Sequence, residues 1–125
     1  KKVYGIELVE EAIEDAKINA TNNNVLNTYF YASDLKGFFS EKKSDIEKPD
    51  TIIIDPPRPG LHPQVVNDII NLAPSKIVYI SCNPSTQARD IKLFNENSFK
   101  IDDIQPIDMF PHTPHIECVV TLKNK

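Results

Sequence analysis

The sequence predicts a doubly wound α/β domain, in which helices cover both faces of a mainly parallel sheet. Two observations lead to this fold. Short runs rich in β-branched and aromatic residues alternate with longer helical patterns, at roughly 20 to 28 residues per strand-helix unit. In addition, "TIIID" (51–55) and "KIVYIS" (76–81) are almost entirely apolar, as in strands that are buried on both faces. Parallel strands joined by helices need right-handed crossovers, which is the doubly wound arrangement.

The first half of the chain contains three strand patterns with helical patterns between them. Strands are predicted at residues 3–7, 28–33 and 51–55. The helix after the first strand covers 8–23, because apolar residues recur there at every fourth position: Leu8, Ala12, Ala16 and Ala20. A short helix is predicted at 35–43, and "EKPD" forms the turn before the third strand.

The second half continues the alternation and ends in two strands. A helix is predicted at 62–74, with Pro63 near its first turn and Pro74 after its end. The next helix covers 84–97, with Asn83 as its N-cap and Pro84 in its first position. The strands of this half are predicted at 76–81, 99–110 and 117–124.

Composition excludes several classes of protein. A net charge of -4 argues against a protein whose whole surface grips nucleic acid, because that needs clustered Lys and Arg. There is no apolar run of about 18 residues and no charged-then-apolar leader, so neither a membrane span nor a secretory signal is indicated. We expect a cytoplasmic location by default, with Cys82 and Cys118 as reduced free thiols.

Acidic residues stand at the ends of three successive predicted strands. They are Glu7, Asp34 and Asp55. Ligands of such sheets bind outside the carboxyl ends of the strands, so the series suggests a nucleoside-like ligand. Glu7 would take both ribose hydroxyls, and Asp34 would lie near an adenine edge. Each acidic residue has an equally plain alternative, which is to cap the following helix.

A glycine-rich phosphate or adenosyl loop is absent from the sequence. The only glycines are Gly5, Gly37 and Gly60, and they form no G-x-G pattern. Either the ligand is not a nucleotide, or the first strand and its loop precede Lys1. We expect the second, with residues 1–125 forming the C-terminal portion of a catalytic domain that is truncated on its N-terminal side.

Two residues suggest covalent chemistry. Cys82 follows a strand and precedes a helix, whose unpaired N–H groups favour a thiolate nucleophile. A structural thiol at a strand end is the alternative. Glu117 starts the last strand between Ile116 and Cys118, where it suits a general base or acid. Its alternative is a surface carboxylate on an edge strand.

Other polar residues allow weaker interpretations. Arg58 and Arg89 are candidates for contacting a phosphate and so positioning a substrate, although Arg89 also fits an exposed helix residue. His112, His115 and Cys118 stand at three-residue spacing, which allows a metal site. We predict none, because Pro111 and Pro114 stiffen the segment and no CxxC pair accompanies it.

Three motifs together resemble a known family. "DPPRPG" (55–60), "SCNPSTQARD" (81–90) and "DMFPHTPHIECVV" (108–120) are similar, in this order, to the signature motifs of the RNA uracil-5 methyltransferases. The resemblance covers essentially the whole chain. It implies a Rossmann-like class I S-adenosylmethionine-dependent methyltransferase fold that lacks its first strand and Gly-rich loop. It also implies that Cys82 is the nucleophile and Glu117 the general base. Glu7, Asp34 and Asp55 would then bind S-adenosylmethionine.

The resemblance implies an RNA partner, with 23S ribosomal RNA expected rather than tRNA. An iron–sulfur cluster is expected only in an N-terminal part outside this sequence, and activity is expected to need the longer protein. The alternatives are a methyltransferase acting on an exocyclic amine, or an isolated half-domain without catalysis. Such a half-domain would expose unpaired strand edges, so we expect self-association of the truncated chain.

Overall fold

A computed structural model describes residues 1–125, apart from the side chain of Lys43. The chain divides into two compact units, Lys1–Glu47 and Lys48–Lys125, and each has its own sheet. The two units are therefore described one at a time.

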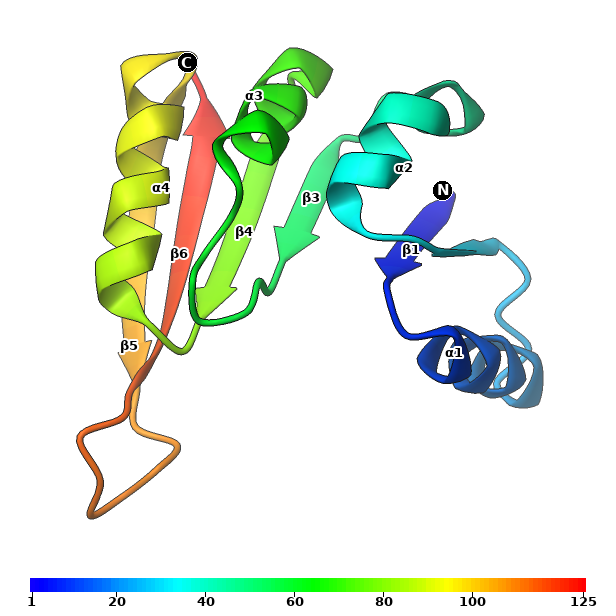
Figure 1. Cartoon of the computed structure of the whole chain (residues 1–125), viewed down its shortest axis with the longest axis horizontal. Helices are drawn as coiled ribbons and strands as arrows, with labels where there is room; N and C mark the ends of the chain where they lie inside the picture. Colours follow the sequence, from blue (N-terminus) through cyan, green and yellow to red (C-terminus); the bar gives the residue numbers. More distant parts are fainter. The chain divides into compact units, whose positions relative to one another are not determined.

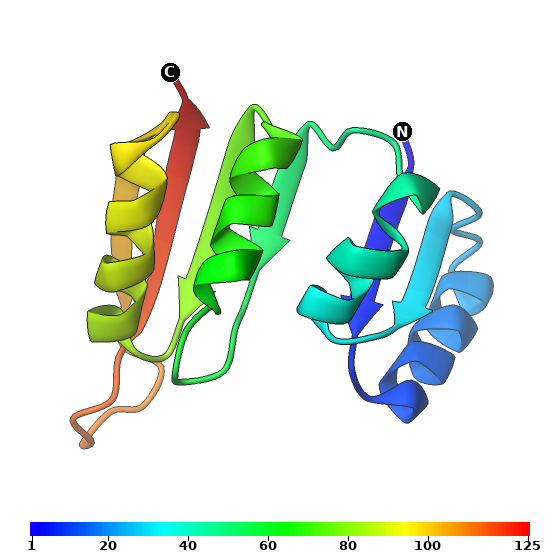
Figure 2. The same ribbon diagram turned by 45° about the horizontal axis from the view of Figure 1, so that its top comes forward.

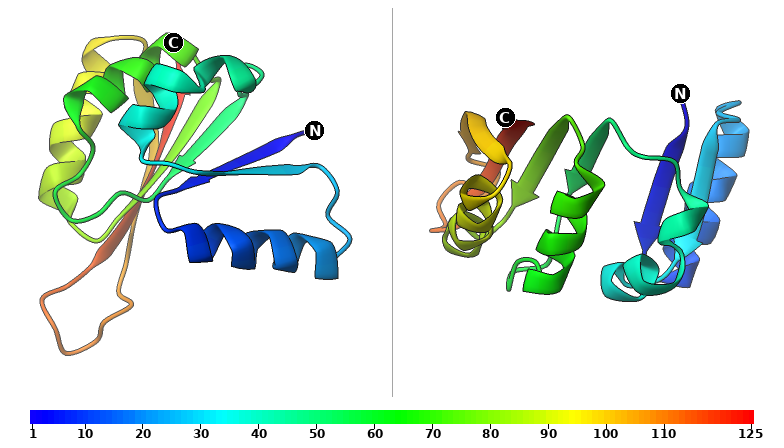
Figure 3. Two further views of the ribbon diagram at one scale, coloured as in Figure 1. Left: turned by 45° about the vertical axis from the view of Figure 1, so that its right-hand side comes forward. Right: turned by 90° about the horizontal axis from the view of Figure 1, so that it is seen from above.

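The first unit is a two-stranded parallel sheet with helices on opposite faces (Figure 3). Its elements are β1 (Val3–Glu7), α1 (Glu10–Asn22), β2 (Thr28–Ala32), α2 (Leu35–Glu41) and the 3-10 turn η1 (Lys43–Asp45). Ile13 of α1 and Phe38 of α2 are buried, and the Phe38 ring meets Tyr31 edge to face. Gly5 leaves room for the ring of Phe30, because a Cβ atom there would lie 2.7 Å from Phe30 Cδ1.

The second unit holds a four-stranded mixed sheet. Its elements are β3 (Thr51–Ile54), α3 (Pro63–Leu72), β4 (Lys76–Ser81), α4 (Pro84–Glu96), β5 (Phe99–Ile107) and β6 (Glu117–Asn124). The strand order is β3-β4-β6-β5. β3 and β4 run parallel, whereas β6 is antiparallel to both of its neighbours. The last strand is thus inserted between β4 and β5.

Helices α3 and α4 of this unit lie side by side on one face of the sheet (Figures 1 and 2). Residues of β4 alternate accordingly: Ile77, Tyr79 and Ser81 are buried, and Val78 and Ile80 are half-buried. Together with apolar residues of the two helices they form one core, whose other members are Ile54, Leu61, Val65, Val66, Ile69, Ile91, Phe94, Phe99, Val120 and Leu122.

The predicted elements are all present, with ends that shift by up to three residues. The largest difference is at the fifth strand of the prediction, which ends at Ile107 instead of residue 110 because a separate turn begins at Phe110. Asn83 accepts a hydrogen bond from Ser85 N, which confirms it as the cap of α4. The parallel pairing expected in a mainly parallel sheet is present in β1–β2 and β3–β4, and β6 adds antiparallel pairing with β4 and β5.

No helix in the described part of the chain is long and apolar enough to cross a membrane.

Candidate active site

The end of β4 and the start of β6 meet at one edge of the second sheet. The antiparallel register pairs Ser81 with Cys118. Cys82 directly follows β4 and Glu117 is the first residue of β6, so both stand at this end of the strand pair. Pairing alone thus brings the predicted nucleophile beside the predicted base.

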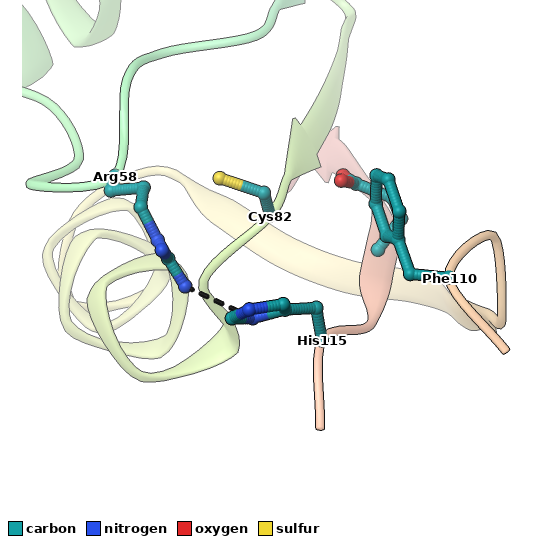
Figure 4. Close-up of a pocket in the computed structure, with 5 residues that line it drawn as sticks. Arg58, Cys82, Phe110 and His115 are labelled. Carbon is teal, nitrogen blue, oxygen red and sulfur yellow. Dashed lines mark hydrogen bonds between the residues drawn. The ribbon is translucent and has the colours of Figure 1, made fainter. Parts of the chain in front are cut away.

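A pocket of about 190 Å³ opens at this edge (Figure 4). Its lining comes from three segments of the second unit and consists of Arg58, Cys82, Phe110, His115 and Glu117. Arg58 belongs to the loop after β3, and Phe110 and His115 belong to the loop between β5 and β6. A thiol, a carboxylate, a guanidinium, an imidazole and an aromatic ring therefore face one small space.

Cys82 occupies a sharp turn between β4 and α4. The Ser81 hydroxyl accepts a hydrogen bond of 3.0 Å from Asn83 N and lies 3.2 Å from Asn83 O, to which it donates. Pro84 is the first helical residue, so the helix begins two residues after the thiol. The thiol is half-buried and lies close to the N-terminus of α4.

The other cysteine has a different environment. Both cysteines are free thiols, as predicted. Cys118, however, faces the helices with 7% of its surface exposed, and burial raises the pKa of its thiol. It is therefore a small core residue and does not share the pocket.

The "DPPRPG" loop is fastened to the N-terminal half of α4. The Arg58 carbonyl accepts hydrogen bonds from Thr86 Oγ1 at 2.9 Å and from Asn83 Nδ2 at 3.2 Å. Gly60 N donates to Pro57 O at 2.8 Å, which closes a turn around Arg58. These contacts fix the backbone from which the Arg58 side chain enters the pocket.

Asp90, which is fully buried, holds the far end of the same loop. One carboxylate oxygen accepts 2.7 Å hydrogen bonds from Leu61 N and from the Tyr79 hydroxyl, and the other accepts two from Arg89. Burial, reinforced by the Asp90 carboxylate, raises the pKa of Tyr79 well above its ordinary value, so this phenol stays a donor. Gly60 has φ +79° and touches Asp90 and Arg89 so closely that a Cβ atom would lie 2.6 Å from Asp90 Oδ2.

Gln87 ties α4 to both strands beneath the pocket. Its side-chain amide, which is 2% exposed, donates 2.9 Å hydrogen bonds to the carbonyls of Tyr79 on β4 and Cys118 on β6. One side chain therefore spans the gap between the strand ends that carry Cys82 and Glu117.

The loop between β5 and β6 is built around a turn. Thr113 N and Thr113 Oγ1 both donate to Phe110 O, at 3.1 and 2.7 Å, and Thr113 Oγ1 accepts from His115 N at 3.2 Å. His112 adopts a left-handed conformation with φ 67°. The turn presents Phe110 and His115 to the same pocket, and Arg58 Nη2 lies 3.2 Å from His115 Nδ1 (Figure 4).

The acidic residues stand at the strand ends where they were predicted, and two of them also hydrogen-bond to the start of the following helix. In the first unit, Glu7 pairs with Ala32, so Glu7 and Asp34 stand at the same edge of the two-stranded sheet. Each also serves its following helix: Glu7 Oε1 accepts from Val9 N at 3.0 Å, and Asp34 Oδ1 caps α2 through Gly37 N at 2.8 Å. In the second unit, Asp55 is exposed directly after β3.

Two other candidates lie apart from the pocket lining. Arg89 directs its guanidinium to Asp90 and to the carbonyls of Pro59 and Leu61, so it braces the loop instead of reaching into the pocket. In the metal interpretation, Cys118 faces the helices while His115 lines the pocket. Among the residues whose side chains are described, no three potential ligands gather.

The sequence alone does not single out Thr86, Gln87 or Asp90, and it indicates Phe110 and His115 only as members of the proline-stiffened loop 110–115, with His115 also as an alternative metal ligand. The sequence does offer an indication for the three residues of α4, because Thr86, Gln87 and Asp90 are polar residues of the motif that contains Cys82. Their partners, however, are loop and strand atoms that only the fold brings near.

Comparisons with known proteins agree with these motifs. A family model described as tRNA (Uracil-5-)-methyltransferase matches residues 1–125. A curated "Uncharacterized RNA methyltransferase" from Bacteroides thetaiotaomicron is 50% identical over 124 residues, which are 98% of this chain and 27% of that protein. One from Clostridium tetani is 49% identical over 125 residues, 100% of this chain and 27% of that protein. The chain thus spans about a quarter of the length of these curated relatives.

Solved structures are similar over nearly the whole chain. Pyrococcus abyssi tRNA (uracil-54, C5)-methyltransferase, in complex with S-adenosyl-L-homocysteine, has a TM-score of 0.79 and 41% identity over 97% of this chain and 28% of that one. Precorrin-6y C5,15-methyltransferase from Geobacter metallireducens has a TM-score of 0.73 at 11% identity, covering 98% of this chain and 67% of that one. The second similarity shows the fold alone, which is the predicted Rossmann-like methyltransferase fold.

Proposed function

Because the chain belongs to the tRNA (uracil-5-)-methyltransferase family, we propose that the protein containing it methylates carbon 5 of a uridine in RNA. In this proposal Cys82 is the nucleophile and Glu117 is the general base. The observation that supports these roles is their shared pocket, in which a thiol and a carboxylate lie at the same sheet edge.

The first step is required by the chemistry of uracil. Carbon 5 is a weak nucleophile, so the ring must be activated before it can accept a methyl group. The Cys82 thiolate adds its electron pair to carbon 6, the C5=C6 pair shifts to C4–C5, and the carbonyl pair moves onto the oxygen of carbon 4. The resulting enolate is nucleophilic at carbon 5. In this proposal the attacking sulfur stands in the turn between β4 and α4.

The last step requires a base. Once carbon 5 carries the methyl group, it still holds its proton, and the ring cannot become aromatic while the proton remains. Glu117 takes this proton, the C–H pair forms C5=C6 again, and the S–C6 pair returns to Cys82 as thiolate. The adduct has its C5 and C6 atoms adjacent in the ring, which suits two side chains that line one small pocket.

The carboxylates at the strand ends fit S-adenosylmethionine in their chemistry. S-adenosylmethionine supplies, when bound, a methyl group that is electrophilic because it is attached to a sulfonium sulfur. Glu7 ends β1 and Asp34 comes after β2 in the first unit, whereas Asp55 directly follows β3 in the second, and each of these strands pairs in parallel. Carboxylate oxygens accept hydrogen bonds from ribose hydroxyls and an adenine amine, and the carboxyl ends of parallel strands are where such ligands bind. We therefore propose Glu7 and Asp34, in the first unit, as ligands of S-adenosylmethionine, and for Asp55 the same role stays a prediction from the sequence.

The RNA must present its uridine unstacked. A base inside a helix cannot reach a cysteine at the bottom of a pocket, so the target nucleotide has to be flipped out or single-stranded. Phe110, which is 46% exposed at the pocket, offers an aromatic face for the flipped base. The choice of ribosomal over transfer RNA stays a prediction, as does a cytoplasmic location. Arg58, not Arg89, is the arginine that we retain as a substrate-positioning residue.

A methyl-transfer assay tests this proposal. The complete protein is incubated with S-adenosylmethionine labelled on its methyl group and with ribosomal RNA or tRNA, and the modified nucleoside is identified after digestion. We expect 5-methyluridine with the wild type and none with Cys82→Ala. Label on an exocyclic amine, retained in Cys82→Ala, would instead support an amine methyltransferase, which needs no thiol.

A further inference from the structure

The contact between Arg58 and His115 joins two loops that carry no part of the proposed covalent chemistry. Arg58 Nη2 lies 3.2 Å from His115 Nδ1. A guanidinium has only donors, so Nδ1 must accept this hydrogen bond. In a neutral imidazole the proton then resides on Nε2. Arg58 thus selects the tautomer of His115 that keeps an N–H donor at the other side of the ring.

The backbones of Arg58 and His115 are both fixed by hydrogen bonds. The Arg58 backbone is bound through its carbonyl by Thr86 and Asn83 of the α4 region. The His115 backbone donates to Thr113 Oγ1, which belongs to the turn that starts at Phe110. A donor whose support is already in place does not need to reorganise when charge develops on its acceptor.

We infer that His115 donates a hydrogen bond from Nε2 to the oxygen on carbon 4 of the uracil ring and so stabilises the enolate. This inference rests on the proposed function, because it concerns the adduct that Cys82 forms. When the S–C6 bond forms, the negative charge of the thiolate moves to that oxygen. A donor aimed there binds the enolate more strongly than the neutral ring, which lowers the barrier to addition.

The residues that line the pocket indicate His115 as the hydrogen-bond donor to the oxygen on carbon 4. In the ring, carbon 4 follows carbon 5, which in turn follows carbon 6. With Cys82 at carbon 6 and Glu117 at the proton of carbon 5, the oxygen of carbon 4 meets the remaining lining residues. Of these, Phe110 has no donor, and Arg58 is bound through Nη2 to the imidazole, whose Nε2–H is the donor that this contact fixes.

The same donor has a consequence for specificity. Cytosine carries an amino group on carbon 4, which would set two donors against each other and leave both unsatisfied. A site that pairs with a substrate oxygen rejects an analogue that lacks it. His115 therefore discriminates uridine from cytidine as well as assisting addition.

Two substitutions distinguish the role of His115 Nδ1 as an acceptor from the role of Nε2 as a donor. His115→Asn keeps an acceptor oxygen within reach of Arg58 but has no donor at the Nε2 position. His115→Gln places an amide N–H near that position. His115 is exposed in a loop, so both variants should keep the thermal midpoint of the wild type, which is measured first.

The readout is the rate at which the complete protein, with S-adenosylmethionine, forms a covalent adduct with RNA carrying 5-fluorouridine at the target position. Fluorine at carbon 5 cannot leave as a proton, so this rate reports the steps before Glu117 acts. We expect His115→Asn to slow the adduct about 100-fold. The His115→Gln variant should form the adduct about tenfold faster than His115→Asn. The affinity of both variants for RNA should be unchanged, because phosphate contacts dominate RNA binding.

Either of two results would overturn the inference: a wild-type rate in His115→Asn, or equal losses in the Asn and Gln variants. The Cys82→Ala protein is run in parallel to judge the proposed function separately. If Cys82→Ala still methylates uridine, the proposed function fails whatever the His115 variants do. If Cys82→Ala is inactive and His115→Asn is not slowed, only the role of His115 fails.

Discussion

Cys82 and Glu117 line one pocket. Cys82 directly follows β4 and Glu117 begins β6, and these two strands are antiparallel neighbours whose register pairs Ser81 with Cys118. Both residues are therefore attached to one hydrogen-bonded strand pair. This arrangement suits a reaction in which bonds at adjacent ring atoms are made and broken in turn. It also makes the site sensitive to residues beneath the strands.

Alkylation should distinguish the two cysteines. Cys82 is half-buried at the start of a helix, whereas Cys118 is buried and its thiol pKa is raised by burial. We expect iodoacetamide at neutral pH to label Cys82 and to leave Cys118 unmodified in the folded protein. Mass spectrometry of tryptic peptides measures this, and in denaturant both should react. Faster labelling of Cys118 than of Cys82 would contradict the assignment.

Gln87→Met should destabilise the strand pair that carries the pocket. The substitution leaves two buried carbonyls, those of Tyr79 and Cys118, without the amide donor. We expect the free energy of unfolding to fall by about 2 kcal/mol or more, measured by urea denaturation. Gln64→Met on the exposed surface of α3 is the matched control and should change it by less than about 0.5 kcal/mol. Equal effects would show that the Gln87 bridge contributes nothing.

The carboxylate of Asp90 should contribute more than any one of its partners. Asp90→Asn replaces an acceptor oxygen by a donor that faces Arg89 or Leu61. We therefore expect the free energy of unfolding to fall by about 3 kcal/mol. Tyr79→Phe removes one hydrogen bond and should cost about 1 to 2 kcal/mol. Tyr29→Phe, at a ring that is 43% exposed, serves as the control with little change. A smaller loss in Asp90→Asn than in Tyr79→Phe would refute this order.

Two left-handed positions should respond with opposite signs. Gly60→Ala places a Cβ atom against Asp90 and Arg89 at a residue with φ +79°. We therefore expect the free energy of unfolding to fall by about 1 to 2 kcal/mol or more. Ala73 ends α3 at φ 48°, where glycine is the preferred residue. Ala73→Gly should therefore stabilise the protein by about 0.5 to 1 kcal/mol. Thermal unfolding of both variants measures the difference, and the same sign in both would contradict the backbone argument.

Local patterns in the sequence were sufficient to predict the elements of the fold. The apolar run 51–55 and the prolines at both ends of α3 mark boundaries that depend on nearby residues alone. The antiparallel insertion of β6 between β4 and β5 was not predicted, because it depends on pairing between distant segments. That pairing brings Glu117 and Cys82 to one edge of the sheet, and no local pattern in the sequence specifies it.

The polar residues divide in a similar way. Asn83 was predicted as a cap because its partner is two residues away. Arg89 was considered for a phosphate, yet its donors meet Asp90 and the carbonyls of the loop around Gly60. Nothing in the local sequence specifies that the loop folds over α4. For the same reason His115 and its contact with Arg58 were visible only in the fold.

The most direct test of the central claim is a trapping experiment with Glu117→Gln. The complete variant protein is incubated with substrate RNA and S-adenosylmethionine, and covalent RNA–protein complexes are resolved under denaturing conditions and mapped by mass spectrometry. If Glu117 is the base, an adduct of methylated uridine on Cys82 accumulates while free product does not. Release of methylated RNA at the wild-type rate, with no adduct on Cys82, would contradict the account.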